Sequence, residues 1–153
     1  YEPQLIDATF ALLISSSGAP MVIPALNRDG DILSDLVLPL FGSIAGSESL
    51  LVAFGDDYVP SALIAEAAHG TAPALEGKDV ANPMAMILAG AALLTHAEEE
   101  ELQDAGRAIR EACLEAVAEG VRTSDLGGHH GTSAFTDEVI RRTKTKLDIW
   151  RSM

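Results

Sequence analysis

Apolar residues recur every three or four positions along much of the chain, which is the spacing of helices that bury one face. This spacing predicts helices over residues 2–15, 29–40, 84–94 and 98–120, and a last helix from Thr132 onward. Polar residues are expected to cap the starts of four of these helices. These caps are Asp29, Asn82, Thr95 with its partner Glu98, and Thr132. Pro39 should break or kink the second helix near its end.

Three shorter apolar runs predict strands, at residues 21–23, 50–54 and 63–66. Pro24 ends the first run, and residues 55–57 follow the second as a turn in which two adjacent carboxylates are solvated. Strands and amphipathic helices in one chain indicate an α/β fold. Because no Gly-x-Gly-x-x-Gly pattern follows a strand, a Rossmann dinucleotide site has no support.

Composition and charge narrow the classes of partner. The 153 residues carry a formal net charge of −13, which argues against nucleic acid or an anionic membrane as a partner. Cys113 is the single cysteine, so the chain forms no internal disulfide and suits a reducing compartment. The apolar run at residues 84–94 is too short to span a bilayer, and no secretory signal pattern is present. We therefore expect a cytoplasmic protein.

Two carboxylates on the second predicted helix are candidates for a metal site. Asp31 and Asp35 stand four positions apart, so both side chains lie on one helical face. Like charges at this spacing repel by roughly 0.2–0.5 kcal/mol, and a bound divalent cation would reverse the sign. Mg²⁺ and Mn²⁺ favour such oxygen ligands. In the structural alternative, Asp31 lies in the first helical turn, where the dipole favours anions, and Asp35 is simply solvated.

Histidine and asparagine supply further candidates. His69 opens a segment of short side chains, residues 69–74, that can wrap a flat ring with backbone and hydroxyl contacts. Alone, such a histidine is more often an ordinary surface or core residue. Asn82 followed by proline also has a purely structural reading as a helix start. The adjacent residues 129–130 are both histidine, yet no cysteine or third histidine stands at zinc-ligand spacing.

Four sequence patterns together resemble the isocitrate/isopropylmalate dehydrogenase family of metal-dependent decarboxylating dehydrogenases. They are Asn27-x-x-Gly30-Asp31-Ile32-Leu33-Ser34-Asp35-Leu36, Glu66-Ala67-Ala68-His69-Gly70-Thr71-Ala72-Pro73, Asn82-Pro83, and Asp125-Leu126-Gly127-Gly128 with Thr132. The resemblance covers the chain from Gln4 to Arg142. It implies a partial, non-Rossmann α/β fold that corresponds to the C-terminal half of much longer proteins. The start at Tyr1 agrees with a fragment or a processed piece.

The resemblance implies that the full-length protein oxidises a 2-hydroxy acid with a nicotinamide cofactor and Mg²⁺ or Mn²⁺, and then decarboxylates the product. The implied metal ligands are Asp7, Asp31 and Asp35, with Asp7 serving the neighbouring subunit. The implied cofactor-binding residues are Glu66, His69, Gly70, Thr71, Ala72, Asn82 and Asp125. Ala74 and Leu75, at positions that help choose the cofactor, are neither basic nor acidic, which favours NAD modestly and leaves NADP possible.

The resemblance also implies a division of the chain and a set of partners. Residues 1–46 would belong to the dimer interface and metal site, residues 47–143 to the cofactor-binding large domain, and residues 144–153 to a tail without an assigned role. The family's catalytic lysine and tyrosine and its substrate-binding arginines lie in the half not present, so this chain contributes no catalytic residue. We expect a homodimer or larger assembly. The alternative is a non-catalytic relative or fragment that serves assembly, regulation, or metal and nucleotide binding.

Overall fold

The computed structural model describes residues 3–16, 20–40 and 46–152. The chain divides into two compact units, Tyr1–Ile44 and Ala45–Met153. The division falls close to the predicted boundary at residue 46, but the assignment of the two parts to a dimer-interface region and a cofactor-binding domain stays a prediction. Within the described residues, no helix is both long enough and apolar enough to cross a membrane.

The first unit contains two helices, α1 (Ile6–Ser15) and α2 (Asn27–Leu40), which contact each other. The strand predicted at residues 21–23 is wrong, because this segment lies in irregular structure and pairs with no strand among the described residues. The prediction that Asp29 caps α2 is also wrong. The backbone N–H of Gly30 already donates to Leu26 O (2.7 Å), so the helix begins before Asp29. Pro39 lies inside the last turn of α2, and the helix is described up to Leu40, close to the predicted position of the break.

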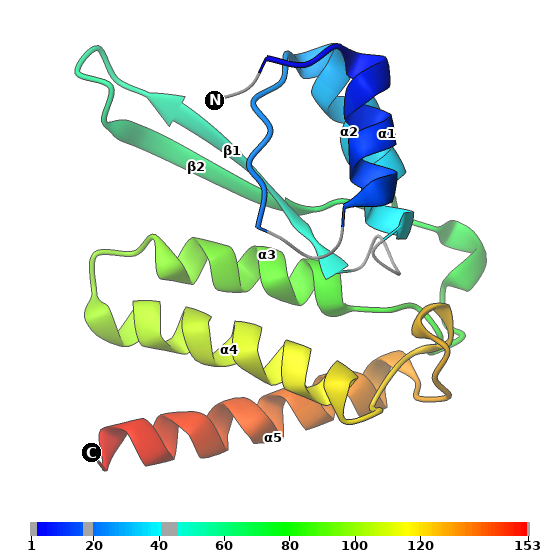
Figure 1. Ribbon diagram of the computed structural model, residues 1–153. Coiled ribbons are helices and arrows are strands. Elements are labelled where there is room, and N and C mark those ends of the chain that lie inside the picture. The colour runs from blue at the N-terminus through cyan, green and yellow to red at the C-terminus, as the bar shows by residue number, and fades with distance from the viewer. Residues whose placement is uncertain (1–2, 17–19, 41–45, 153) are drawn as a thin grey trace. The chain divides into compact units, whose positions relative to one another are not determined.

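The second unit begins with an antiparallel hairpin of β1 (Glu48–Phe54) and β2 (Pro60–Ala67), as Figure 1 shows. Both strands were predicted at these places, although each is longer than its apolar run. Leu51 pairs with Ile64 across the hairpin, and the register is irregular between Ala53 and Phe54. The turn between the strands carries the solvated carboxylates of residues 56–57, as predicted.

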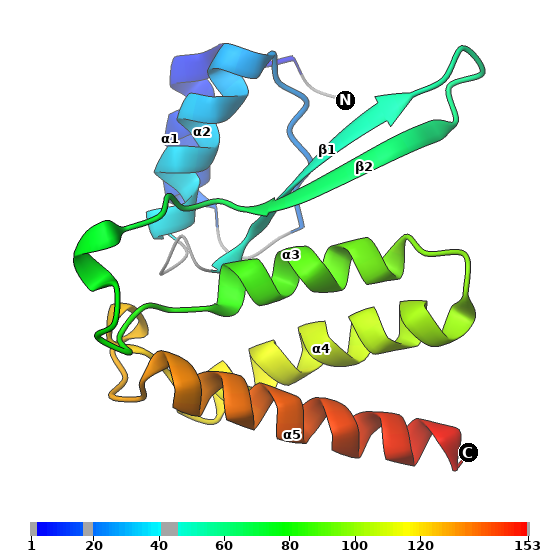
Figure 2. The ribbon, with the colours of Figure 1, turned by 180° about the vertical axis from the view of Figure 1, so that it is seen from behind.

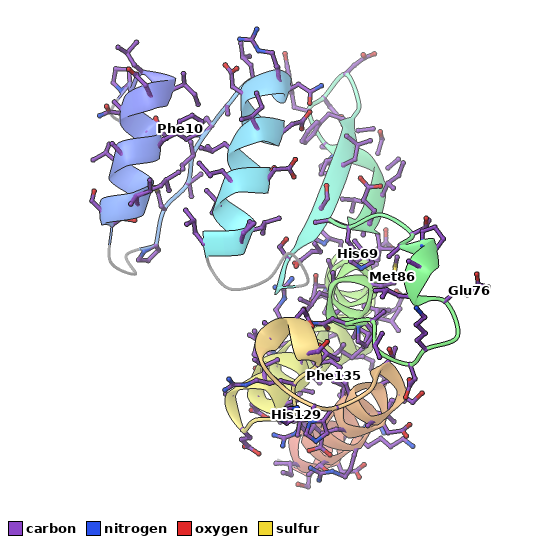
Figure 3. The ribbon with its side chains drawn as sticks, turned by 90° about the vertical axis from the view of Figure 1, so that its right-hand side faces the viewer. Phe10, His69, Glu76, Met86, His129 and Phe135 are labelled. Carbon is purple, nitrogen blue, oxygen red and sulfur yellow. The ribbon has the colours of Figure 1, made fainter. Side chains whose placement is uncertain are left out.

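Three helices follow the hairpin: α3 (Met84–Thr95), α4 (Glu100–Ala118) and α5 (Thr132–Arg151). Helix α3 packs on the hairpin and on α4, and α4 packs on α5 (Figures 1 and 2). Figure 3 shows Phe135 among these helices, where its side chain is fully buried. The core comprises Met84, Leu88, Ala112, Cys113, Ala116, Phe135 and Val139. Burial raises the pKa of the Cys113 thiol to about 12, which agrees with its reading as a small core residue.

Helix starts in the second unit also differ from the sequence expectation. Thr95 belongs to the end of α3, where its hydroxyl donates to Ala92 O (2.8 Å), so it forms no capping box for α4. Thr132 is the first residue of α5 and follows the cap residue Gly131, and its hydroxyl donates to Ala81 O (2.5 Å). Each threonine hydroxyl donates to a carbonyl oxygen instead of accepting an N–H of the next helical turn. The carbonyl lies in the preceding turn for Thr95 and in a distant segment for Thr132. Local sequence alone could not distinguish these partners.

Helix α5 extends through most of the segment predicted as a tail. It continues to Arg151, and Arg107 of α4 lies with its guanidinium 4.8 Å from the centre of the Trp150 ring. A guanidinium at this distance over an aromatic ring is a cation–π contact. The end of α5 is therefore fastened to α4.

Candidate functional site

The candidate metal ligands lie on the two helices of the first unit. Asp31 and Asp35 stand one turn apart on α2, and both are exposed. Asp7 is exposed in the first turn of α1, where its Oδ1 accepts the N–H of Ala8 (2.9 Å). Among the described residues no group of three or more histidine, cysteine, aspartate or glutamate side chains could hold a metal ion. Asp31 and Asp35 therefore offer the oxygen ligands that a hard divalent cation favours, but a single chain leaves such a site open.

The candidate cofactor loop follows β2 directly. Glu66 lies near the end of β2 and is exposed, as are His69, Gly70 and Thr71 beyond it. The Nδ1 atom of His69 lies 2.9 Å from the carbonyl oxygen of Gly70. Ala72 adopts a left-handed conformation (φ 42°) and precedes the short 3-10 helix η2 (Pro73–Leu75). The loop thus presents small side chains and backbone groups to solvent, with the ring of His69 at its start (Figure 3).

Asn82 and Asp125 are brought together from distant parts of the chain. The Nδ2 atom of Asn82 donates to Oδ2 of Asp125 (2.9 Å), and Oδ1 of Asn82 accepts the backbone N–H of Met84 (3.0 Å). Asp125 lies in the 3-10 helix η3 (Ser124–Leu126), and its Oδ1 accepts the hydroxyl of Thr123 (2.5 Å). Asn82 therefore bonds to the start of α3 and to Asp125, but Pro83 and not Asn82 is the N-cap residue, so the predicted cap is one residue early.

A second set of bonds joins the same two segments, and sequence reasoning missed it. Asp79, in a left-handed conformation (φ 53°), accepts the backbone N–H and the hydroxyl of Ser133 at its Oδ1, both at 2.8 Å. These bonds lower the pKa of the Asp79 carboxyl and supply a cap to α5. The backbone N–H of Thr132 donates to Asp79 O (3.1 Å). Local sequence gave no signal for this contact, because Thr132 stands there as an apparent cap and Asp79 lies 54 positions from Ser133.

A family model gives the decisive comparison, because a model of the isocitrate/isopropylmalate dehydrogenases matches residues 1–139. The chain belongs to this family. It is 36% identical over 140 residues to isocitrate dehydrogenase [NAD] catalytic subunit 5, mitochondrial, of Arabidopsis thaliana, which covers 91% of this chain and 35% of that protein. It is also 36% identical over 141 residues to the probable tartrate dehydrogenase/decarboxylase of Bacillus subtilis, covering 92% of this chain and 38% of that protein.

Solved structures confirm the fold class. The isocitrate dehydrogenase of Methylococcus capsulatus superposes with a TM-score of 0.73 at 33% sequence identity, over 92% of this chain and 40% of that one. The chain therefore has part of the α/β fold of the isocitrate/isopropylmalate dehydrogenases. It spans 35–38% of the length of the two curated relatives named above.

Arg122 makes two hydrogen bonds in the loop that follows α4. The Nε atom of Arg122 donates to Val117 O (2.6 Å), at the end of α4. The backbone N–H of Arg122 donates to Nδ1 of His130 (3.3 Å). These bonds give Arg122 and His130 structural roles in the loop.

Proposed function

We propose that this chain is the C-terminal part of a decarboxylating dehydrogenase that oxidises a 2-hydroxy acid with NAD and a divalent metal ion. One observation carries the proposal: in a chain of this family, α2 presents Asp31 and Asp35 one turn apart on an exposed face. Without an ion, two solvated carboxylates at this spacing only repel each other. A role as metal ligands would explain why both carboxylates stand on this face.

The metal site would be built by carboxylates of two subunits. Asp31 and Asp35 would hold Mg²⁺ or Mn²⁺ through their oxygens, and Asp7 of the neighbouring subunit would complete the protein ligands. A divalent ion, when bound, supplies Lewis-acid polarisation of the substrate oxygens. Substrate and water oxygens would fill the remaining positions, which agrees with a site that one chain leaves open.

The cofactor site would lie on the loop after β2 and on the Asn82–Asp125 contact. Glu66, His69, Gly70, Thr71, Ala72, Asn82 and Asp125 would bind and orient the adenosine part of the cofactor. A nicotinamide cofactor supplies the hydride acceptor when bound. NAD is favoured over NADP because Ala74 and Leu75 carry no cation and Arg122 directs its Nε to a backbone carbonyl.

Turnover by the full-length protein tests the proposed activity. Isocitrate, isopropylmalate and tartrate are offered in turn with NAD or NADP, in the presence of Mg²⁺ or Mn²⁺. We expect oxidation of at least one acid, loss of activity with a chelator, and a higher kcat/KM with NAD than with NADP. A full-length protein that reduces neither cofactor with any of these acids would contradict the proposal and favour a non-catalytic relative. A higher kcat/KM with NADP would overturn the cofactor choice alone.

Metal binding is tested by calorimetric titration of the same full-length protein. Asp31→Asn and Asp35→Asn should each weaken Mn²⁺ binding, because each removes a charged oxygen ligand. Asp29→Asn is the matched control, since Asp29 lies on the same helix and pairs with Arg28 at 3.1 Å. An affinity that neither Asp31→Asn nor Asp35→Asn changes would refute the ligand assignment.

A further inference from the structure

The two faces of the β1–β2 hairpin have different surroundings. Successive side chains of a strand point to opposite faces of a sheet. Helix α3 packs on the hairpin, as Figures 1 and 2 show. Val52, Leu63 and Ala65 are half-buried, whereas their neighbours in each strand are exposed. These three residues therefore mark the face that is turned toward α3.

The opposite face, which we call the outer face, is apolar along most of its length. Leu51 pairs with Ile64 across the hairpin, and Ala53 pairs with Ala62. All four residues are exposed, Leu51 to 67% and Ile64 to 58%. The solvated face of an antiparallel sheet is normally polar, and an apolar pair in water forgoes the stabilisation that burial gives. The outer face therefore has the composition of a surface that is buried in the complete protein.

The size of the outer face indicates what kind of partner covers it. Its apolar part ends where Ser49 pairs with Glu66, so it consists of two large side chains and two alanines. A stable interface between separate chains needs about 800 Å² from each partner, which these four side chains cannot supply. A cover from the same polypeptide needs less area, because it loses no translational or rotational freedom by association.

We propose that the outer face of the hairpin is covered by apolar side chains from the part of the full-length protein that lies outside residues 1–153. This inference rests on the function proposed above, in which the chain is the C-terminal part of a longer enzyme. The chain covers only 40% of the Methylococcus capsulatus isocitrate dehydrogenase, so most of that protein lies outside the matched part. A protein of that length has ample chain to form the cover.

Thiol labelling tests the proposal, because a maleimide reacts only with a cysteine that it can reach. Leu51→Cys and Ile64→Cys place a thiol on the outer face, one on each strand. Asp56→Cys is the matched control, since Asp56 is exposed in the turn of the same hairpin. Each variant is prepared in the 153-residue chain and in the full-length protein, and its labelling rate is measured at several protein concentrations. The unsubstituted proteins supply the background, to which the buried Cys113 contributes little.

In the 153-residue chain we expect all three variants to react at similar rates. In the full-length protein, Leu51→Cys and Ile64→Cys should react roughly tenfold more slowly or less, because labelling then requires the cover to open. Asp56→Cys should keep its rate in both proteins. Ile64→Cys tests the proposal by itself where Leu51→Cys fails to fold.

Three results would overturn the proposal. Equal rates for the outer-face cysteines in both proteins would mean that the face stays exposed. Slow labelling already in the 153-residue chain would mean that this chain covers its own hairpin. Protection that disappears on dilution would identify a second copy as the cover. Labelling does not depend on turnover, so a full-length protein that oxidises none of the acids can still protect the outer face, and an active one can leave it exposed.

Discussion

At the scale of single residues, Gly131 lets two distant segments meet at the start of α5. A Cβ atom at this position would lie 2.4 Å from Oδ2 and 2.7 Å from the carbonyl oxygen of Asp79. Real Cβ atoms do not approach other atoms so closely, so either Asp79 or α5 would have to move. Asp79 is the residue that caps α5 through Ser133, and glycine is therefore required here for close approach.

Gly131→Ala should destabilise the protein by about 1–3 kcal/mol, the usual cost of overpacking a fitted contact. Ala134→Ser is the control, because it adds one heavy atom to an exposed residue in the same helical turn. Its effect should stay within about 0.5 kcal/mol. Urea unfolding of the full-length protein measures both. Equal stability of Gly131→Ala and the wild type would show that the two segments move apart at little cost.

Part of the candidate site could be predicted from the sequence. The predictable residues are those whose arrangement depends on near neighbours in the chain. Asp31 and Asp35 were predictable because a helix of known period places them one turn apart, and α2 has that period. Asn82 was predictable near the start of α3 from local sequence, although the helix begins one residue later than a cap at Asn82 requires. Its contact with Asp125 was not, because the two residues lie 43 positions apart and only the fold brings them together.

At the scale of elements, charged side chains fasten α5 to α4. Arg142 is only 11% exposed, and its guanidinium lies 2.6 Å from Glu119 and 2.7 Å from Glu138. One turn further along α5, Lys146 lies 2.6 Å from Glu115 and 3.1 Å from Glu111. Glu111 and Glu115 of α4 and Glu119 at its C-cap thus pair with cations of α5, whereas Glu138 pairs with Arg142 within α5. Hydrogen bonds from Arg141 and Arg142 lower the pKa of Glu138 from 4.5 to about 2.

The shifted pKa of Glu138 predicts a loss of stability in acid. Its ionised form is favoured by the fold, so its contribution is complete above pH 4.5 and is lost as the pH falls toward 2. Glu138→Gln should therefore be less stable than the wild type at neutral pH, and the difference should shrink at a pH of about 3. Asp137→Asn makes the same charge change at an exposed neighbour. Urea unfolding of the full-length protein at both pH values should show no such convergence for this control.

At this scale, the presence of helices and strands was predicted better than the residues at which they begin and end. In the part of the chain that the structure describes, apolar spacing predicted the five α-helices and the two paired strands, because those patterns report which face of an element is buried. The strand expected at residues 21–23 failed because a strand needs a hydrogen-bonded neighbour, which no local pattern specifies. Thr95 failed as a cap because its hydroxyl bonds to the preceding turn of α3. A threonine hydroxyl can donate to a carbonyl of the preceding turn or accept an N–H of the next helix, and packing decides which bond forms.

At the scale of the whole molecule, the first unit exposes much apolar surface. Helix α1 contains no buried residue, and Leu33 of α2 is the one buried apolar residue described in this unit. Val22 and Leu26, between the helices, are 91% and 81% exposed. Exposed apolar side chains gathered in one small unit are typical of a surface that packs against further protein, either another subunit or the rest of the proposed full-length protein. Together with Asp7, Asp31 and Asp35 in the same unit, this supports our proposal that two subunits build each metal site.

Mixed dimers test whether Asp7 serves the neighbouring subunit. Asp7→Asn and Asp35→Asn should each inactivate the full-length homodimer, because every site loses one metal ligand. Co-expressed, the two variants should recover roughly a quarter of the wild-type activity, since about half of the dimers are mixed and one of their two sites combines the intact Asp7 of one chain with the intact Asp31 and Asp35 of the other. Co-expressed Asp31→Asn and Asp35→Asn are the control and should recover nothing, because every site then lacks one carboxylate of α2. If Asp7 served its own chain, the first mixture would also stay inactive, and purification through a different affinity tag on each variant would show whether mixed dimers had formed.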